Sequence, residues 1–81
     1  MAKLQDYQKE KIKEIISDLV DVPTENVVEE VELSDGLGMD SLDVVDMIMR
    51  CEKEFDCNIP YEDYADVKTV GDVFKIVENR I

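Results

Sequence analysis

Apolar residues recur at steps of three and four positions through the first 20 residues, and this spacing constrains the fold more than any other feature. Such steps place side chains on one face of an α-helix, whereas a half-buried strand needs alternate residues. The predicted amphipathic helix covers about residues 3–20, with an apolar stripe of Leu4, Tyr7, Ile12, Ile15, Ile16, Leu19 and Val20. Pro23 ends the pattern, because proline cannot continue a helix interior.

Three further helices are predicted after a long loop. The helical spacing resumes over residues 41–55 and stops before Ile59 and Pro60, and residues 61–65 form a short helix. Thr69 and Asp72 then form a capping box, which opens a last helix with an apolar face of Val70, Val73, Phe74 and Val77. Because no strand pattern competes, we expect one domain over residues 1–81, an all-α up-down bundle of three long helices and one short helix.

The loop over residues 23–39 is long for a compact domain, and loops of this length often carry function. A short helical turn is expected near residues 25–28. The residues expected to pin the loop to the core are Val27, Val31, Leu33 and Leu37.

Composition excludes several classes of function. The chain has 81 residues, a formal net charge of −12 and no histidine, so the commonest general base and metal ligand is absent. The acidity repels nucleic acid and anionic lipid and favours basic protein partners. Cys51 and Cys57 do not form a C-x-x-C pair, so we expect no metal site and reduced thiols in the cytoplasm. No apolar run indicates membrane insertion or secretion.

The predicted helix over residues 41–55 carries two apolar faces. On a helical wheel, the expected core face consists of Val44, Met47, Ile48, Cys51 and Phe55. A separate stripe, bordered by acids, consists of Leu42, Val45 and Met49. Periodicity alone leaves two interpretations of this stripe: a docking surface, or a second buried contact with the loop or the first helix.

Ser41 lies where the loop ends and this helix begins. A serine at a helix start is exposed among unpaired backbone N–H groups, and a phosphate bonded to it would meet the positive end of the helix. Ser41 is therefore a candidate for covalent attachment, although an Asp-Ser pair at this position is also typical of a simple helix cap.

A family resemblance favours attachment. Gly38-x-Asp40-Ser41-Leu42-Asp43 is followed by an acidic helix, by Ile59-Pro60 and by the cap at Thr69. With the length, acidity and helix order, this sequence resembles the acyl carrier proteins over nearly the whole chain. The resemblance implies that a phosphopantetheinyl transferase moves 4′-phosphopantetheine from coenzyme A to Ser41. It also implies that the thiol of this arm carries acyl chains as thioesters in fatty-acid or polyketide synthesis, and that the chain is a carrier and not an enzyme.

The resemblance further implies that ketosynthases, acyltransferases and related enzymes dock through basic patches on the second helix. The matching positions here are Asp40, Leu42, Asp43, Val45, Asp46, Met49 and Glu52. Arg50 and Lys53 depart from the family's nearly all-acidic helix, which leaves a specialised pathway open. We expect a monomer. In the family the acyl chain lies between the helices, where Val44, Met47 and Cys51 could leave room for it.

Other interpretations remain open. A peptidyl or aminoacyl carrier domain shares the attachment serine and the fold, although the strong acidity favours the acyl type. A noncovalent acidic adaptor would use the acidic face alone. A calcium-binding loop is disfavoured, because Asp35-Gly36 and Asp40-x-x-Asp43 do not have the spacing of an EF-hand.

Overall fold

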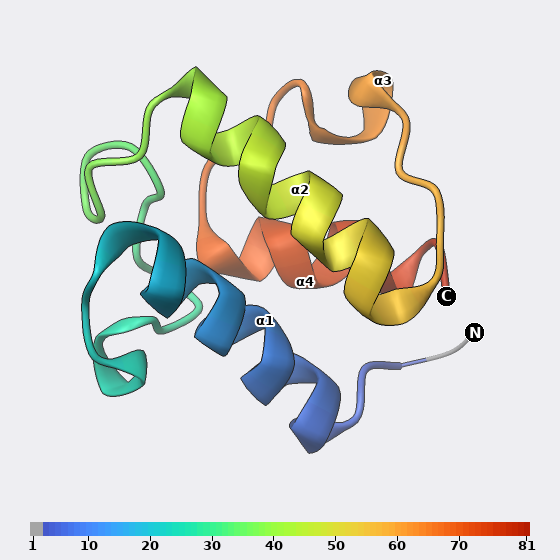
Figure 1. Cartoon of the computed structure of the whole chain (residues 1–81), viewed down its shortest axis with the longest axis horizontal. Helices are drawn as coiled ribbons and strands as arrows, with labels where there is room; N and C mark the ends of the chain where they lie inside the picture. Colours follow the sequence, from blue (N-terminus) through green and yellow to red (C-terminus); the bar gives the residue numbers. More distant parts are fainter. Residues whose placement is uncertain (1–2) are drawn as a thin grey trace.

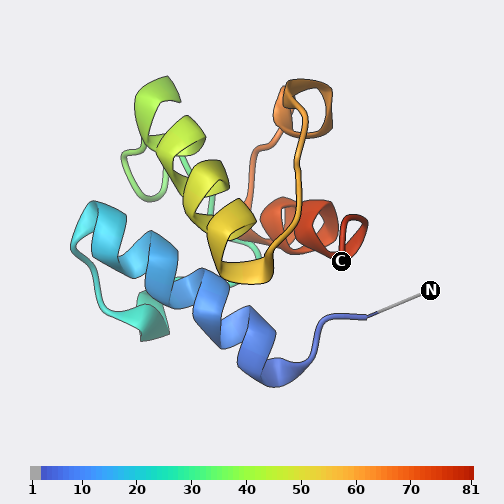
Figure 2. The ribbon, with the colours of Figure 1, turned by 45° about the vertical axis from the view of Figure 1, so that its right-hand side comes forward.

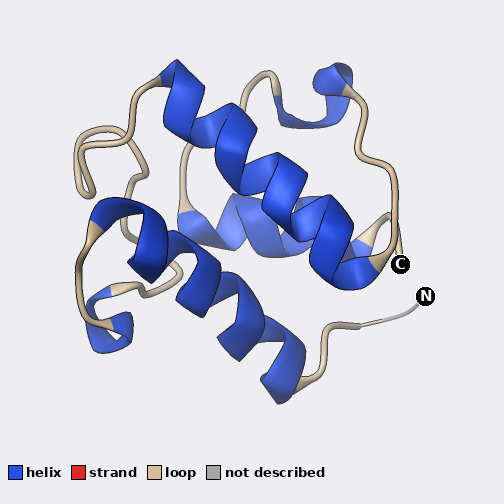
Figure 3. Cartoon of the chain, viewed as in Figure 1, coloured by secondary structure: helices blue, strands red, loops and turns tan. Residues whose placement is uncertain are grey.

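The computed structural model describes residues 3–81, which form helices joined by loops with no strand in this range (Figure 1, Figure 3). The elements in chain order are α1 (Asp6–Val20), the 3-10 turn η1 (Thr24–Asn26), α2 (Ser41–Phe55), α3 (Tyr61–Tyr64) and α4 (Val70–Glu78). Helices α1 and α2 lie side by side and antiparallel, and α4 lies behind α2 (Figure 1, Figure 2). The predicted all-α bundle is confirmed.

Helix α1 begins at Asp6 and not near residue 3 as predicted. The side chain of Gln8 accepts a hydrogen bond from the Gln5 N–H at 2.8 Å, which fixes the helix start. Tyr7 does not belong to the apolar stripe, because it is 67% exposed. The first turn of α1 precedes the part that packs on the core, where Ile12 and Ile16 are fully buried.

The core is apolar, with no buried polar or charged residue in the described range. From α2 it contains Met47, Ile48 and Cys51, with Val44 and Phe55 half-buried beside them, so the predicted core face is confirmed. The opposing residues of α4 include Val70, Val73, Phe74 and Val77, as predicted. Within the part of the chain that the structure describes, no helix is long and apolar enough to cross a membrane.

The long loop is pinned to the core at several points. Val27 and Leu33 are buried and Val31 and Leu37 are half-buried, which confirms the predicted contacts. The predicted helical turn is η1, which begins one residue earlier and ends two residues earlier than expected. A bridge between Glu32 and Thr69 ties the middle of the loop to the start of α4, where the Leu33 N–H donates to the Lys68 carbonyl at 2.9 Å.

Capping boxes begin α2 and α4. Thr69 and Asp72 cap α4 as predicted, and hydrogen bonds from Thr69 and Lys68 lower the pKa of the Asp72 carboxyl. The short helix α3 ends at Tyr64, one residue before the predicted end, and has no buried residue. It lies apart from α2 and above α4 (Figure 2). The body of the bundle therefore consists of α1, α2 and α4, with α3 on its margin.

Two methionines of α2 give a matched test of its inner and outer faces. Met47 is fully buried and Met49 is 61% exposed. Met47→Ala is expected to lower the free energy of unfolding by ~2–5 kcal/mol, because it removes buried apolar volume. Met49→Ala should change it by less than ~0.5 kcal/mol, because alanine maintains the helix and no core contact is lost. Chemical denaturation followed by circular dichroism measures both values, and equal losses would place Met49 in the core.

Candidate attachment and docking site

Ser41 is the first residue of α2, and the residue before it provides the helix cap. Asp40 has an extended backbone, and its carboxylate accepts a hydrogen bond from the Asp43 N–H at 2.9 Å. In return the Asp43 carboxylate accepts from the Asp40 N–H at 3.2 Å. The Ser41 side chain is exposed, and its hydroxyl makes no hydrogen bond with residues 3–81. Capping is therefore the task of Asp40, and the serine hydroxyl is left free.

The loop holds this serine at a fixed place on the bundle. Met39, two residues before Ser41, is buried, and its N–H donates to the Leu33 carbonyl at 2.9 Å. Gly38 has a φ of 73°, a conformation that glycine adopts without strain. Sequence analysis did not place Met39 in the core. Its burial could have been predicted from its position, because an apolar residue directly before a helix cap often packs on the first turns of the helix as a hydrophobic staple.

The outer face of α2 presents the predicted apolar stripe to solvent. Leu42 is 78% exposed, Met49 61% and Val45 38%. Buried contact with the loop or α1 is thus excluded for Leu42 and Met49. The acids Asp40 and Asp46 are exposed and Asp43 is half-buried along the same surface, so apolar and acidic groups alternate there.

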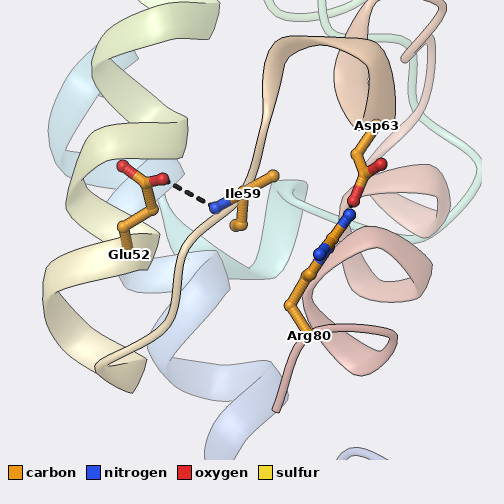
Figure 4. Close-up of polar contacts among 4 residues, drawn as sticks. All are labelled: Glu52, Ile59, Asp63 and Arg80. Carbon is orange, nitrogen blue, oxygen red and sulfur yellow. Dashed lines mark hydrogen bonds and ion pairs between the residues drawn. The ribbon is translucent and has the colours of Figure 1, made fainter.

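Two members of the predicted docking set have partners within the fold. The Asp46 carboxylate accepts a hydrogen bond from Arg50 Nε at 3.0 Å. The Glu52 carboxylate accepts one from the Ile59 N–H at 2.7 Å, which holds the exit loop against the last turns of α2 (Figure 4). Glu52 therefore has a structural role that the sequence pattern did not indicate.

A second polar contact in Figure 4 holds α3 in place. Arg80 donates from Nε to the Asp63 carboxylate at 2.5 Å, and this bond lowers the pKa of the Asp63 carboxyl. The contact joins the residues after α4 to α3. Because α3 buries no residue of its own, this ion pair holds it to the end of the chain, and the Glu52 bond holds the loop that leads into it.

A hollow of about 180 Å³ opens between the start of α2 and α3. Ser41, Val44 and Val45 line it on one side, and Tyr61, Tyr64 and Val67 on the other. The two tyrosine rings pack edge to face, with centroids 5.3 Å apart. Sequence analysis did not predict that the two tyrosines form one side of this hollow. The pattern that could have indicated it is the pair of aromatic residues three positions apart in the short helix. Val44 lines the hollow, whereas Met47 and Cys51 lie in the core.

Neither cysteine is set up as a reactive thiol. Burial, with smaller contributions from Cys57, Glu54 and Glu52, raises the pKa of Cys51 to about 12. Cys57 is half-buried, and burial together with Glu52 and Asp56 raises its pKa above the ordinary value. Since the thiolate is the nucleophile, both side chains are poorly reactive near neutral pH.

Comparisons with known proteins agree on one family. Residues 10–77 match the family described as "Phosphopantetheine attachment site". The acyl carrier protein of Thermosynechococcus vestitus is 42% identical over 72 residues, 89% of each chain, and that of Clostridium perfringens is 44% identical over 68 residues, 84% of this chain and 90% of that protein. The solved acyl carrier protein of Enterococcus faecalis has a TM-score of 0.78 at 26% identity, covering 94% of this chain and 96% of that one.

These matches define a phosphopantetheine-dependent carrier. The chain belongs to the acyl carrier protein family, whose cofactor is 4′-phosphopantetheine. The predicted family is confirmed over nearly the whole chain.

The thiols give a direct test of the local structure. In the folded protein at pH 7, iodoacetamide is expected to modify Cys57 slowly and Cys51 hardly at all, because a pKa of about 12 leaves almost no thiolate at Cys51. In denaturant both residues should react at similar rates. Mass spectrometry of digested samples follows each residue. Modification of Cys51 as fast as Cys57 in the folded state would show that the core is open at this position.

Proposed function

We propose that Ser41 is the residue that takes the 4′-phosphopantetheine arm. The observation that carries this assignment is made at the start of α2. Asp40 caps the helix, so the Ser41 hydroxyl is exposed and has no hydrogen-bond partner in the described range. A residue that must enter the active site of a transferase needs such a hydroxyl.

The local backbone supports a phosphodiester at this position. The N–H groups of Ser41 and Leu42 have no hydrogen-bond partner within residues 3–81, and they form part of the positive end of the α2 dipole. Phosphate oxygens accept hydrogen bonds from such groups. Asp40 and Asp43 carry negative charge nearby, but their oxygens are engaged with each other's N–H groups.

The other serines lack these features. The Ser17 hydroxyl lies in α1 and donates to the carbonyl of Val22, so it is already bonded. Ser34 is exposed, but it lies in the loop and begins no helix. Ser41 is the serine that joins exposure, a helix start and the Asp-Ser-Leu sequence.

The arm supplies a thiol that carries acyl groups as thioesters, and the chain itself presents and positions that arm. It contains no histidine to deprotonate Ser41, and the neighbouring Asp40 carboxylate is used in the cap. The base for attachment must therefore come from the transferase. This supports a carrier that is modified by other enzymes and is not itself a catalyst. Similarity to proteins named acyl carrier proteins supports acyl cargo over aminoacyl or peptidyl cargo.

The outer face of α2 is proposed as the surface that partner enzymes recognise. The docking face consists of Asp40, Leu42, Asp43, Val45, Asp46, Met49 and Glu52. Leu42 and Met49 offer exposed apolar contacts, and the acids attract basic patches of a phosphopantetheinyl transferase, a ketosynthase or an acyltransferase. The overall charge of −12 adds attraction at longer range. We propose that residues 1–81 act as one monomeric domain in the cytoplasm, serving fatty-acid or polyketide-type synthesis.

The attachment site is tested by enzymatic modification. With coenzyme A, magnesium and a broad-specificity phosphopantetheinyl transferase, the wild type is expected to gain one arm, because one serine hydroxyl is exposed at a helix start. Ser41→Ala should gain none, while Ser34→Ala should gain one as the matched control. Intact-mass spectrometry measures the additions. An unmodified wild type would favour a noncovalent acidic adaptor, and a modified Ser41→Ala would move the site elsewhere.

Docking is tested by removing charge without removing hydrogen-bond acceptors. Asp43→Asn together with Asp46→Asn is expected to slow association with the transferase and to reduce its dependence on salt, because asparagine maintains the local bonds and loses the charge. Asp18→Asn with Asp66→Asn, which are exposed on α1 and after α3, makes the same change in net charge. Stopped-flow binding over a range of salt concentrations measures both pairs. Equal slowing by the two pairs would show that only net charge matters.

A further inference from the structure

The charges on α2 are divided between its two halves. No lysine or arginine occurs between residues 14 and 46, and the charged residues in the first half of α2 are both acids, Asp43 and Asp46. Arg50 and Lys53 then follow within one turn of each other, and both are exposed. At 1.5 Å per residue, Asp43 and Arg50 are separated by about 10 Å along the helix axis. The outer face of α2 is therefore acidic at one end and partly basic at the other.

The two cations keep free hydrogen-bond donors, although Arg50 is paired with Asp46. Arg50 uses Nε for the bond to Asp46, and its terminal N–H groups make no hydrogen bond with a described residue. Lys53 forms no ion pair within 4.0 Å in the range 3–81. Arginine has five N–H donors and lysine has three, and only one of these eight is used within the described residues, so most of the donors face solvent. A carboxylate from outside would meet free donors here.

The same two residues border a groove between α1 and α2, which is lined by Ile15, Arg50, Lys53 and Glu54 and has a volume of about 460 Å³. Ile15 is half-buried and gives the groove an apolar wall. Met49 is exposed next to Arg50 in the chain, and it belongs to the docking face. The groove therefore continues the docking face at its second end.

We propose that Arg50 and Lys53 form a second recognition zone, which binds an acidic side chain of the same partner enzyme whose basic patch binds Asp43 and Asp46. This inference rests on the proposed docking function and specifies the partner: a surface with basic groups at one end and a carboxylate about 10 Å away. Such a partner is held in one orientation, since reversing it would bring like charges together. An enzyme with a wholly basic patch meets repulsion at Arg50 and Lys53.

These charges also have a structural effect. Cations near the C-terminus of a helix interact favourably with its dipole, and the Asp46–Arg50 pair at spacing i,i+4 supports the helix. Both effects act on the stability of the isolated protein. They do not depend on a partner, so binding measurements separate them from recognition.

The experiment compares two variants of equal charge change in the phosphopantetheinylated protein. Arg50→Gln with Lys53→Gln removes the second zone, and Lys11→Gln with Lys75→Gln removes two exposed cations on α1 and α4. The probe is the purified condensing enzyme of the native cell, and Kd is measured by calorimetry at fixed ionic strength. Thermal unfolding of each variant is measured beside it. The Asp43→Asn, Asp46→Asn variant reports separately on the acidic half.

The Arg50, Lys53 variant is expected to bind the condensing enzyme about tenfold more weakly, because it loses its contacts with a charged group of the partner. The Lys11, Lys75 variant is expected to bind as tightly as the wild type or more tightly. Unchanged or tighter binding by the Arg50, Lys53 variant overturns the second zone while leaving the acidic docking face in place. Equal weakening of binding by the Arg50, Lys53 variant and the Lys11, Lys75 variant also overturns the second zone. If the Asp43, Asp46 variant binds as wild type, the proposed docking function itself fails.

Discussion

Burial of the inner face of α2 is the constraint on which the rest of the structure depends. Met47, Ile48 and Cys51 contribute the side chains that α1 and α4 enclose, and no polar group competes with them for the interior of the described chain. Once this face is fixed against the core, helical geometry turns Leu42 and Met49 outward at the same time. Exposure of the proposed docking face is thus a direct result of how the core is filled. The same rotation of α2 sets the direction in which Ser41 is presented.

The start of α2 shows how the proposed modification site is compatible with a stable helix. A serine is a good cap, and a capping serine would have its hydroxyl engaged by the backbone. Here Asp40 and Asp43 exchange hydrogen bonds around Ser41, so the helix start is satisfied without the serine. Met39 anchors the preceding turn in the core. Order at this site therefore comes from its neighbours, and Ser41 itself stays available for chemistry.

Most of the fold could be predicted from the sequence, because apolar spacing and capping residues are local signals. The bounds of α2 and the box of Thr69 and Asp72 followed directly from them. The early start predicted for α1 was wrong because apolar spacing did not reveal that Leu4 packs outside the helix and Tyr7 faces solvent. The bond from Ile59 to Glu52 and the wall made by α3 depend on how distant segments meet, which spacing does not encode. For the candidate site, the exposed stripe was one of two alternatives until burial separated them.

The two ends of the bundle meet at one place. The Leu4 N–H donates to the Glu78 carboxylate at 3.0 Å, although 74 positions separate them. The segment before α1 and the end of α4 lie away from the start of α2 in the two ribbon views (Figure 1, Figure 2). Neighbouring ends allow a domain to be inserted into a host polypeptide or to be circularly permuted without altering its packing. This bundle is therefore suited to modular engineering, since a tether joined beside Leu4 or Glu78 would leave Ser41 facing outward from the host.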